Sequence, residues 1–292
     1  MLFRSKTMPF FTLVLILVSG LTGIVLAADL FNIFVFIELT SLSAYALVGA
    51  TGGPALMAAL RYLILGTLGA SLYLLGVAYW YAATGTLNMA DLAHQLPALL
   101  DSHAVLWGLV LMMIGLSIKM ALVPLHGWLP DAYTYAPDAV SPLIAPLVTK
   151  VALYALIRIL FWVAGTAVIL RQVPLLMYLS WVGAVATIAG ALLAFAQQNL
   201  KRMFAYSGIS HLGLVVLGVS QGTPTGLAGG IFYLITDAVM QAGLFFIAGA
   251  AIHQCGARGL GELARLRRGM PLTRATLVIT GISMVGFPPT GG

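Results

Sequence analysis

The sequence is poor in cysteine and in charged residues. Its 292 residues include one cysteine, Cys255, and only 8% of them are Asp, Glu, Lys or Arg. One cysteine excludes an internal disulfide and any metal site built from several cysteines. Hydrophobic residues make up 61% of the chain and the mean hydropathy is +1.04, which excludes an ordinary soluble domain because such a domain cannot bury that much apolar surface. The composition therefore predicts an integral membrane protein.

Long apolar runs account for most of the chain. Nine of them are near the roughly 20 residues that a helix needs to cross a bilayer. No signal-peptide cleavage pattern follows the first run, so we interpret it as a retained span. No low-complexity linker separates the runs, which predicts an all-α, polytopic membrane protein with a single membrane domain over residues 1–292. The expected spans lie near 8–28, 30–49, 56–83, 104–123, 139–164, 174–196, 203–220, 226–252 and 272–292.

The cationic residues lie mostly in the short loops between these runs. A positive-inside bias therefore explains the net charge of +6 better than nucleic-acid binding does. Alternate threading of the spans places on the side of Met1 the residues Arg4, Lys6, Arg61, Lys201, Arg202, Arg258, Arg265, Arg267, Arg268 and Arg274. The opposite side receives Arg171, with Arg158 near a helix end, and a loop at 84–103 that has no lysine or arginine. This asymmetry predicts a cytoplasmic N-terminus.

Four ionisable residues remain inside the expected spans: Glu38, Lys119, Lys150 and Asp237. A charge at membrane depth is costly unless it meets a partner or water, so such residues usually face a cavity or one another. A carboxylate beside Lys119 favours the charged lysine, so moving Glu38 away would make Lys119 release its proton. We predict that Glu38, Lys119 and Lys150 form part of a proton or sodium pathway. The alternative is a set of static ion pairs that join helices.

The fourth expected span is interrupted near its end. Pro124, Gly127 and Pro130 fall within seven positions, which one regular helix cannot contain. The carbonyl groups freed by the break need polar partners or water. We expect His126 and Asp131, in the same segment, to cap or brace it rather than to bind a metal ion. No set of His, Cys, Asp and Glu in the sequence has convincing metal-ligand spacing.

The last run is interrupted in a similar manner, by Pro288 and Pro289. If the chain consists of two repeats, at about 8–165 and 174–292, the two breaks fall in the fourth span of each. A unit of five helices places its copy upside down in the membrane, and paired interrupted helices mark the ion or substrate site of inverted-repeat transporters. The alternative is that the prolines only mark helix ends.

Polar residues also lie at helical spacing in the seventh and eighth spans. Ser207, Ser210 and His211 could carry a hydrogen-bonded chain, and histidine titrates near neutral pH. Asp237 and Gln241 share one face of the eighth span. These groups could pass protons onward or could only join neighbouring helices.

Three segments resemble a known family. They are "KMALVPLHGWLPDAYTYAPDAVSPLIAPLVTKVALYALIRI" from Lys119, "DLFNIFVFIELTSLSAYALVGA" from Asp29 and "NLKRMFAYSGISHLG" from Asn199. They are similar to the antiporter-like subunits shared by respiratory complex I, Mrp cation/proton antiporters and membrane-bound hydrogenases. The resemblance covers nearly the whole chain, and the run from Asp29 looks most like the Mrp D-type and hydrogenase subunits, with complex I subunits close to them.

The resemblance implies two inverted five-helix bundles, each with a broken helix and a half-channel. It implies that Glu38 pairs with Lys119, that Lys150 connects the half-channels, and that His211 lies on a central polar axis. It also implies other membrane subunits as partners and a bacterial or archaeal cell membrane. Redox chemistry in such complexes belongs to other subunits, and the sequence has no flavin, quinone-reducing or iron–sulfur motif, so no cofactor is expected.

Two departures from the family pattern stand out. The family usually has about fourteen spans, of which this sequence lacks the first three and ends inside the second broken helix, so the second repeat is expected to be incomplete. Gln241 stands where several relatives have a lysine, and Asp237 where they have a histidine. We predict an ion-translocating membrane subunit of a larger complex. The alternatives are a stand-alone transporter of a small solute and a non-conducting assembly subunit.

Overall fold

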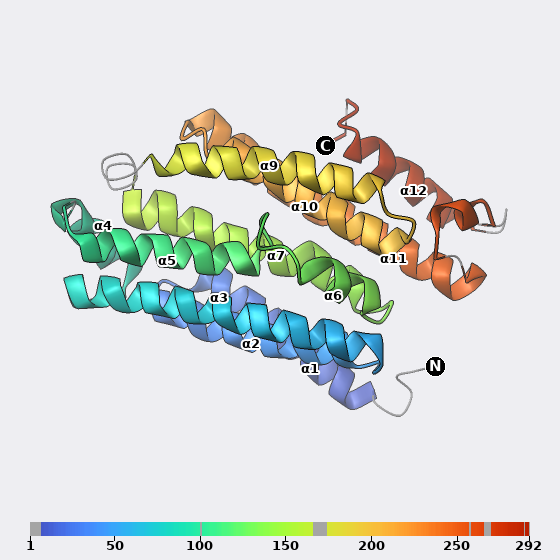
Figure 1. The fold of residues 1–292 in the computed structure, drawn as a ribbon, viewed down its shortest axis with the longest axis horizontal. Helices are drawn as coiled ribbons and strands as arrows, with labels where there is room; N and C mark the ends of the chain where they lie inside the picture. Colours follow the sequence, from blue (N-terminus) through green and yellow to red (C-terminus); the bar gives the residue numbers. More distant parts are fainter. Residues whose placement is uncertain are drawn as a thin grey trace.

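The computed structural model describes residues 7–99, 101–165, 174–256, 258–265, 270–288 and 290–291. These residues form helices joined by short segments, without a β-sheet among them (Figure 1). The prediction of an all-α protein is confirmed. The helices are α1 (Thr7–Leu26), α2 (Leu30–Gly49), α3 (Pro54–Thr84), α4 (Met89–Gln95), η1 (Leu96–Leu99), α5 (His103–Lys119), α6 (Leu129–Tyr135), α7 (Ser141–Arg158), η2 (Ile159–Ala164), α9 (Leu175–Phe195), α10 (Leu200–Val219), α11 (Pro224–Cys255), η3 (Leu260–Arg265) and α12 (Pro271–Met284).

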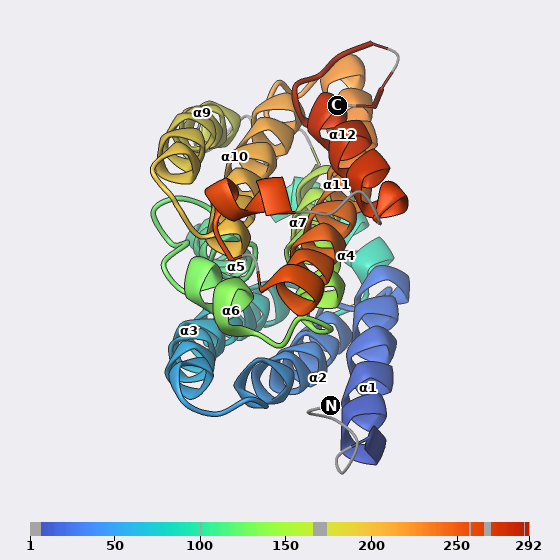
Figure 2. The same ribbon diagram turned by 90° about the vertical axis from the view of Figure 1, so that its right-hand side faces the viewer.

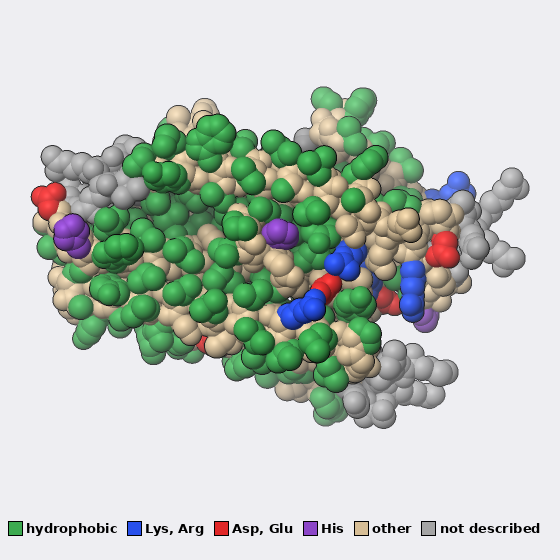
Figure 3. Space-filling view, in the orientation of Figure 1, with side chains coloured by type: hydrophobic (Ala, Val, Ile, Leu, Met, Phe, Trp, Pro, Cys, Tyr) green, Lys and Arg blue, Asp and Glu red, His purple; other side chains and the backbone are tan. Residues whose placement is uncertain are grey.

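Seven helical segments among the described residues are long and apolar enough to cross a bilayer: α1, α2, α3, α7 with η2, α9, α10 and α11. The other two expected spans correspond to α5 and α12, which have 17 and 14 residues. Each ends a few residues before the prolines at which the sequence predicts a break. Many outward-facing side chains are apolar, such as Leu15 and Phe195 at 67% and 93% exposure, and hydrophobic atoms cover most of the face in Figure 3. The chain is an integral membrane protein.

Local chemistry sets several helix boundaries. The Asp29 carboxylate accepts hydrogen bonds from the Phe31 and Asn32 amides at 2.8 and 2.9 Å and so begins α2. Thr223 caps α11 in the same way through the Gly226 amide. Gly85, with φ of 72°, ends α3 in the left-handed conformation that favours glycine.

Close approach through glycines holds α3 against α5. A Cβ atom on Gly69 would lie 2.9 Å from the Gly115 carbonyl oxygen, nearer than real side chains come. A Cβ atom on Gly183 would likewise lie 2.9 Å from the Leu217 amide nitrogen, where α9 meets α10. Small residues at such contacts let membrane helices pack backbone to backbone.

The expected loop at 84–103 contains helical structure. α4 and η1 fold within it, with Leu92 and Leu96 fully buried. The Met89 amide donates to the Ala28 carbonyl at 2.9 Å, and the Leu30 amide donates to the Leu87 carbonyl at 3.0 Å. In the sequence this segment was noted only for its lack of lysine and arginine, which does not predict helices. The buried side chains of α4 and η1 are too few and too close together to give a recognisable hydrophobic pattern.

The two halves of the described chain repeat one order of elements. Three long helices and then a shorter, interrupted one occur as α1, α2, α3 and α5, and again as α9, α10, α11 and α12. In the end-on view the first set lies below and the second above, with α7 in the middle packed against α11 (Figure 2). This order agrees with the two predicted repeats, whose residue limits stay a prediction. The central position of α7 brings Lys150 between the halves.

Candidate functional site

The first break begins earlier than the prolines suggest. α5 ends at Lys119, and the chain is irregular until α6 begins at Leu129. Pro124 lies inside this break, but Pro130 is in the first turn of α6, where a missing N–H costs nothing, so Pro130 starts a helix rather than breaking one. The Trp128 indole N–H donates to the Ile118 carbonyl at 2.9 Å, in addition to the bond that this carbonyl accepts from the Ala121 amide, and so ties the irregular segment to the end of α5.

Asp131 braces the break against two other helices. Its carboxylate forms ion pairs with Arg61 of α3 and with Arg202 of α10, the second at 3.5 Å. The His126 ring lies edge-on to that of Tyr206, with centroids 6.3 Å apart. These contacts match the expected bracing role. The described residues contain no group of three or more His, Cys, Asp and Glu that could hold a metal ion.

Glu38 of α2 lies beside Lys119 at the end of α5. The Lys119 Nζ is 3.8 Å from the Glu38 Oε1, and it donates a hydrogen bond to the Ser41 Oγ at 2.7 Å. The Tyr45 hydroxyl is 3.5 Å away. The Lys119 side chain is 7% exposed, whereas that of Glu38 is 27% exposed. The ammonium therefore has a nearer, neutral partner, and the facing Glu38 Oε1 is buried without a hydrogen-bond partner among the described residues, so the carboxylate is loosely held.

Lys150 of α7 pairs with Asp237 of α11 rather than with Glu38. The Lys150 Nζ lies 2.9 Å from the Asp237 Oδ2 and also donates to the Ala145 carbonyl at 3.2 Å. Asp237 is fully buried. The predicted trio of Glu38, Lys119 and Lys150 is therefore two separate pairs, since Lys150 has its own carboxylate on another helix.

His211 of α10 connects Asp237 to a residue that the sequence analysis missed. The His211 Nδ1 is 3.6 Å from the Asp237 Oδ1 and 2.7 Å from the Tyr233 hydroxyl. The two rings stack, with centroids 5.8 Å apart and planes at 5°. Tyr233 precedes Asp237 by four positions, a spacing that puts both on one face of α11. This spacing in the sequence could have identified Tyr233 as a candidate site residue.

Tyr233 also lines an open groove. The groove has a volume of about 430 Å³ and runs beside Gly230 of α11 and Met284 at the end of α12. Lys150, Asp237, His211 and Tyr233 thus lead from the centre of the molecule to a surface beside the second break. α12 ends at Met284, Gly286 has φ of 75° and Pro288 lies in a turn. Pro289 lies outside the described residues.

The predicted chain of Ser207, Ser210 and His211 does not form. The Ser207 hydroxyl donates to the Phe204 carbonyl at 2.9 Å, and the Ser210 hydroxyl donates to the Thr187 carbonyl at 2.8 Å. Backbone carbonyls on the same or the neighbouring helix compete successfully for serine hydroxyls. Helical spacing alone was thus a poor guide to their partners.

Gln241 lies close to Lys150. Both line a small cavity of about 10 Å³ between α7, α10 and α11. Such a volume is near the lower limit for one water molecule. The Gln241 Nε2 is buried and has no hydrogen-bond partner among the described residues. Where the resemblance implied a lysine, the chain therefore offers a neutral polar group within the reach of one bridging water.

Lys201 is buried, although the sequence analysis assigned it to a loop. Its side chain is 4% exposed and its Nζ lies 2.6 Å from an oxygen of Asp138, which is 42% exposed. The Nζ also donates to the Ala136 carbonyl at 2.9 Å and to the Ser141 hydroxyl at 3.1 Å. Both members of the pair line a surface cavity of about 400 Å³. Two features of the sequence that were missed could have indicated this pair. Lys201 lies in the first turn of a span, and Asp138 lies in the proline-rich segment before α7.

Residues 27–292 match the family described as "NADH:quinone oxidoreductase/Mrp antiporter, TM". The chain belongs to this family. The predicted resemblance is confirmed, and with it the similarity to both the complex I and the Mrp branches.

Two relatives illustrate the breadth of the family. NADH-quinone oxidoreductase subunit N of Desulforudis audaxviator is 46% identical over 283 residues, which are 97% of this chain and 56% of the relative. A subunit of the Na(+)/H(+) antiporter of Bacillus subtilis is 33% identical over 279 residues, 94% of this chain and 55% of the relative. The chain thus spans a little over half the length of these curated relatives.

Two solved structures share the fold. A chain of the membrane-bound sulfane sulfur reductase, an archaeal respiratory membrane complex, has a TM-score of 0.87 and 36% identity, and the match covers 98% of this chain and 60% of that one. A chain of the Mrp complex from Dietzia has a TM-score of 0.86 and 33% identity over 95% of this chain and 51% of that one. Family members thus occur in membrane complexes with different partner modules.

Proposed function

We propose that the chain translocates protons across the membrane as a subunit of a multi-subunit complex. The membrane fold and the family support this proposal. Related chains carry the names of NADH-quinone oxidoreductase and Na(+)/H(+) antiporter subunits. The partners are other membrane subunits of the complex, of the Mrp or the NADH:quinone oxidoreductase type, and electron transfer belongs to those partners.

The observation that carries the proposal is the pair of buried lysine–carboxylate contacts. Glu38 and Lys119 meet at 3.8 Å beside one broken helix, and Lys150 and Asp237 meet at 2.9 Å between the two halves. Buried ionisable groups are costly in a membrane, and inside membrane proteins they commonly mark ion pathways. The four residues lie on four different helices, so the movement of one helix can separate a lysine from its carboxylate.

Proton transfer follows from the geometry of the first pair. Lys119 already donates to Ser41, so it can lose the contact with Glu38 without losing every hydrogen-bond partner. Withdrawal of the Glu38 carboxylate removes the charge that favours the ammonium form, and Lys119 then releases a proton. Return of the carboxylate favours uptake of another proton. The Glu38 side chain is 27% exposed, whereas its Oε1, which faces Lys119, is buried and has no hydrogen-bond partner among the described residues, so nothing but Lys119 holds it.

The second half of the route runs through His211 and Tyr233. Tyr233 donates to the His211 Nδ1 at 2.7 Å when that nitrogen is unprotonated, and His211 faces Asp237. A hydroxyl and an imidazole can both give and accept a proton, so this chain can move protons between Asp237 and the groove beside α12. Lys201 and Asp138, in their surface cavity, are the corresponding water-facing pair at the other end.

The local charges favour protons over sodium ions. Each buried carboxylate faces a lysine ammonium, so a sodium ion at that place would meet a like charge. A sodium site normally offers several oxygen ligands free of cations, and neither pair provides them. The neutral hydroxyl of Ser41 and the amide of Gln241 suit proton-carrying water as well.

A non-conducting assembly subunit is the second candidate. The 2.9 Å contact of Lys150 with Asp237 favours this role, because such an ion pair can serve only to join α7 and α11. A stand-alone solute transporter finds less support, since the described cavity next to Lys150 holds at most about one water molecule.

We also propose that the N-terminus is cytoplasmic in a bacterial or archaeal cell membrane. Arg61, Arg202, Arg258 and Arg274 belong to the end of the molecule at which α1 begins, and lysine and arginine atoms gather toward that end in Figure 3. The positive-inside rule places such an end in the cytoplasm.

The test uses sealed vesicles that carry the assembled complex, with a pH-sensitive dye for protons and radioactive sodium for Na⁺. We expect wild-type vesicles to acidify on energisation, and Lys119→Ala to lower the initial rate at least ten-fold. Native gels show whether the variant still assembles. Sodium uptake without a pH change would contradict the proton proposal, and unchanged acidification in Lys119→Ala would support the assembly role instead.

A further inference from the structure

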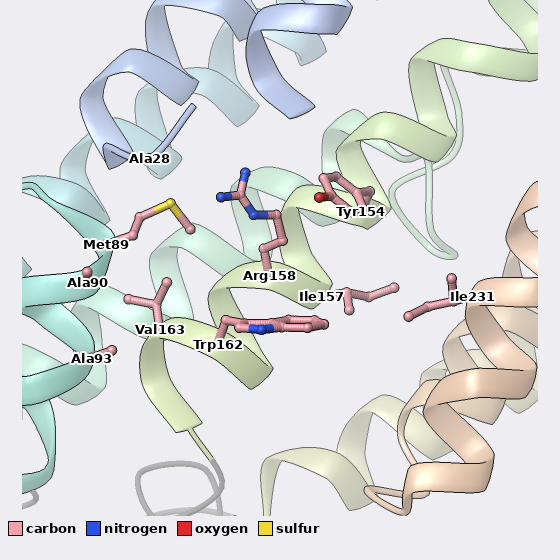
Figure 4. Close-up of a pocket in the computed structure, with 10 residues that line it drawn as sticks. All are labelled: Ala28, Met89, Ala90, Ala93, Tyr154, Ile157, Arg158, Trp162, Val163 and Ile231. Carbon is pink, nitrogen blue, oxygen red and sulfur yellow. The ribbon is translucent and has the colours of Figure 1, made fainter. Parts of the chain in front are cut away.

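A cavity of about 420 Å³ lies near α4, at the end of the molecule away from the start of α1 (Figure 4). Its volume falls within the range of small-ligand pockets. Side chains of α4, α7, η2 and α11 line it, among them Met89, Ala93, Ile157, Trp162 and Ile231. None of the lysine–carboxylate pairs contributes to the lining, so the proposed ion pathway does not account for this cavity.

The lining is mostly apolar, and its polar side chains are Arg158 and Tyr154, both labelled in Figure 4. Its Nη1 donates to the Val25 carbonyl at 3.0 Å, and its guanidinium carbon lies 5.8 Å from the centre of the Tyr154 ring. No carboxylate of the described residues forms an ion pair with Arg158. Asp29 instead caps α2, and Asp91 accepts a hydrogen bond from Thr86. The guanidinium therefore borders the cavity as a cation without a charged partner.

The position of the cavity matches the edge of a bilayer. Trp162, on its wall, is 61% exposed, and tryptophan is enriched at the membrane–water interface. Ile231 is seven residues after the start of α11 at Pro224, about 10 Å along the helix. The cavity thus extends from the level of a lipid headgroup toward the level of acyl chains.

We propose that this cavity binds one anionic phospholipid. The acyl chain lies on the apolar wall between η2 and α11, and the phosphate accepts hydrogen bonds from Arg158, whose planar fork of N–H groups suits phosphate oxygens. An apolar solute would leave the guanidinium without an anion, and a free phosphate ion would leave the apolar wall uncovered. A phospholipid satisfies both.

The test is native mass spectrometry of the full chain in detergent, titrated with phosphatidylglycerol. We expect one tightly bound lipid, and roughly ten-fold weaker binding of diacylglycerol, which lacks the phosphate, as the loss of a charge-assisted hydrogen bond predicts. Arg158→Gln should weaken phosphatidylglycerol binding to a similar degree. Ala93→Leu, which fills the cavity without touching Arg158, should also weaken it.

Arg274→Gln is the matched control, because it removes an exposed arginine of α12 at the other end of the molecule and should leave the binding unchanged. Circular dichroism checks that each variant keeps its helices. Equal binding of phosphatidylglycerol and diacylglycerol by the wild type would overturn the proposal, even if a variant failed to fold. Displacement of the lipid by millimolar inorganic phosphate would overturn it too, since that result indicates a site for a free anion.

Discussion

The two buried lysine–carboxylate pairs differ in how firmly they are held. Lys119 lies 3.8 Å from Glu38 but donates to Ser41 at 2.7 Å, and the glutamate is 27% exposed. Lys150 lies 2.9 Å from Asp237, which is fully buried. The first lysine stands at a helix end next to nine irregular residues, Met120 to Trp128, whereas the second is inside a continuous helix.

This difference suggests that the two pairs have different roles in proton transfer. A loose pair at a broken helix can separate at low cost, because the lysine keeps the Ser41 hydroxyl as a partner. The tight pair, whose aspartate is fully buried, is costly to separate unless another group neutralises the aspartate. His211, at 3.6 Å, is positioned to be that group. We therefore propose that the loose pair acts as the switch and the tight pair as the relay.

The largest expected effect is that of Lys150→Ala. Removing one partner of a buried pair leaves Asp237 uncompensated, a loss of about 3–5 kcal/mol. We expect a clearly lower melting temperature of the purified protein and loss of proton pumping. The double variant Lys150→Ala with Asp237→Ala should recover most of the stability but none of the pumping. Recovery of pumping would show that the pair is only structural.

Glu38→Gln should lower the proton-pumping rate while changing the stability of the protein only slightly. Lys119 has the Ser41 hydroxyl as a nearer partner and Gln keeps the shape of the side chain, so we expect a smaller loss of stability than in Lys150→Ala. The proton-pumping rate should nevertheless fall at least ten-fold, since the neutral amide no longer responds to protonation. Asp91→Asn, which removes a carboxylate of α4 away from both pairs, is the control and should pump normally. A large loss of stability in Glu38→Gln would remove the contrast between the pairs.

Tyr233→Phe should have an intermediate effect. It removes the hydroxyl that bonds to His211 and keeps the stacked ring, a change of about 0.5–1.5 kcal/mol for a neutral hydrogen bond. We expect proton pumping to slow by about two- to ten-fold, measured with the same dye assay. Tyr178→Phe, an exposed tyrosine of α9, should match the wild type. Identical rates in Tyr233→Phe and the wild type would remove Tyr233 from the route.

The smallest effect is expected for Asp131→Asn. Its partners Arg61 and Arg202 are at least partly exposed, and such ion pairs contribute about 0–1 kcal/mol. We expect a slightly lower melting temperature and unchanged pumping. A loss of pumping comparable to that of Glu38→Gln would mean that the bracing of the break, rather than the loose pair, controls transport.

The sequence predicted the fold well because a bilayer has a fixed thickness, so the length of an apolar run indicates whether it forms a membrane-spanning helix. Apolar runs predicted the seven long apolar helices of the described residues and the two shorter ones, α5 and α12, and the prolines predicted that these two would be interrupted. α4 and η1 were missed because a short helix in a connecting segment has no such length signal. The start of the first break was placed at the prolines, although α5 already ends at Lys119.

The partners of the site residues were harder to predict. Spacing along one helix found Asp237 and Gln241, but it could not show that Lys150 would meet Asp237 from another helix. Lys201 looked like a loop cation because its partner, Asp138, is distant in the sequence. Ser207 and Ser210 bond to backbone carbonyls that a sequence pattern does not reveal. Contacts between helices depend on packing, which hydrophobic patterns specify only coarsely.

The most direct test of one continuous pathway is the proton-pumping rate of Lys119→Ala, Lys150→Ala and the double variant, each in fully assembled complex. If the switch and the relay act in series, each single variant loses nearly all pumping and the double variant is no worse. Partial losses that add up in the double variant would contradict the account, because they would show two independent routes.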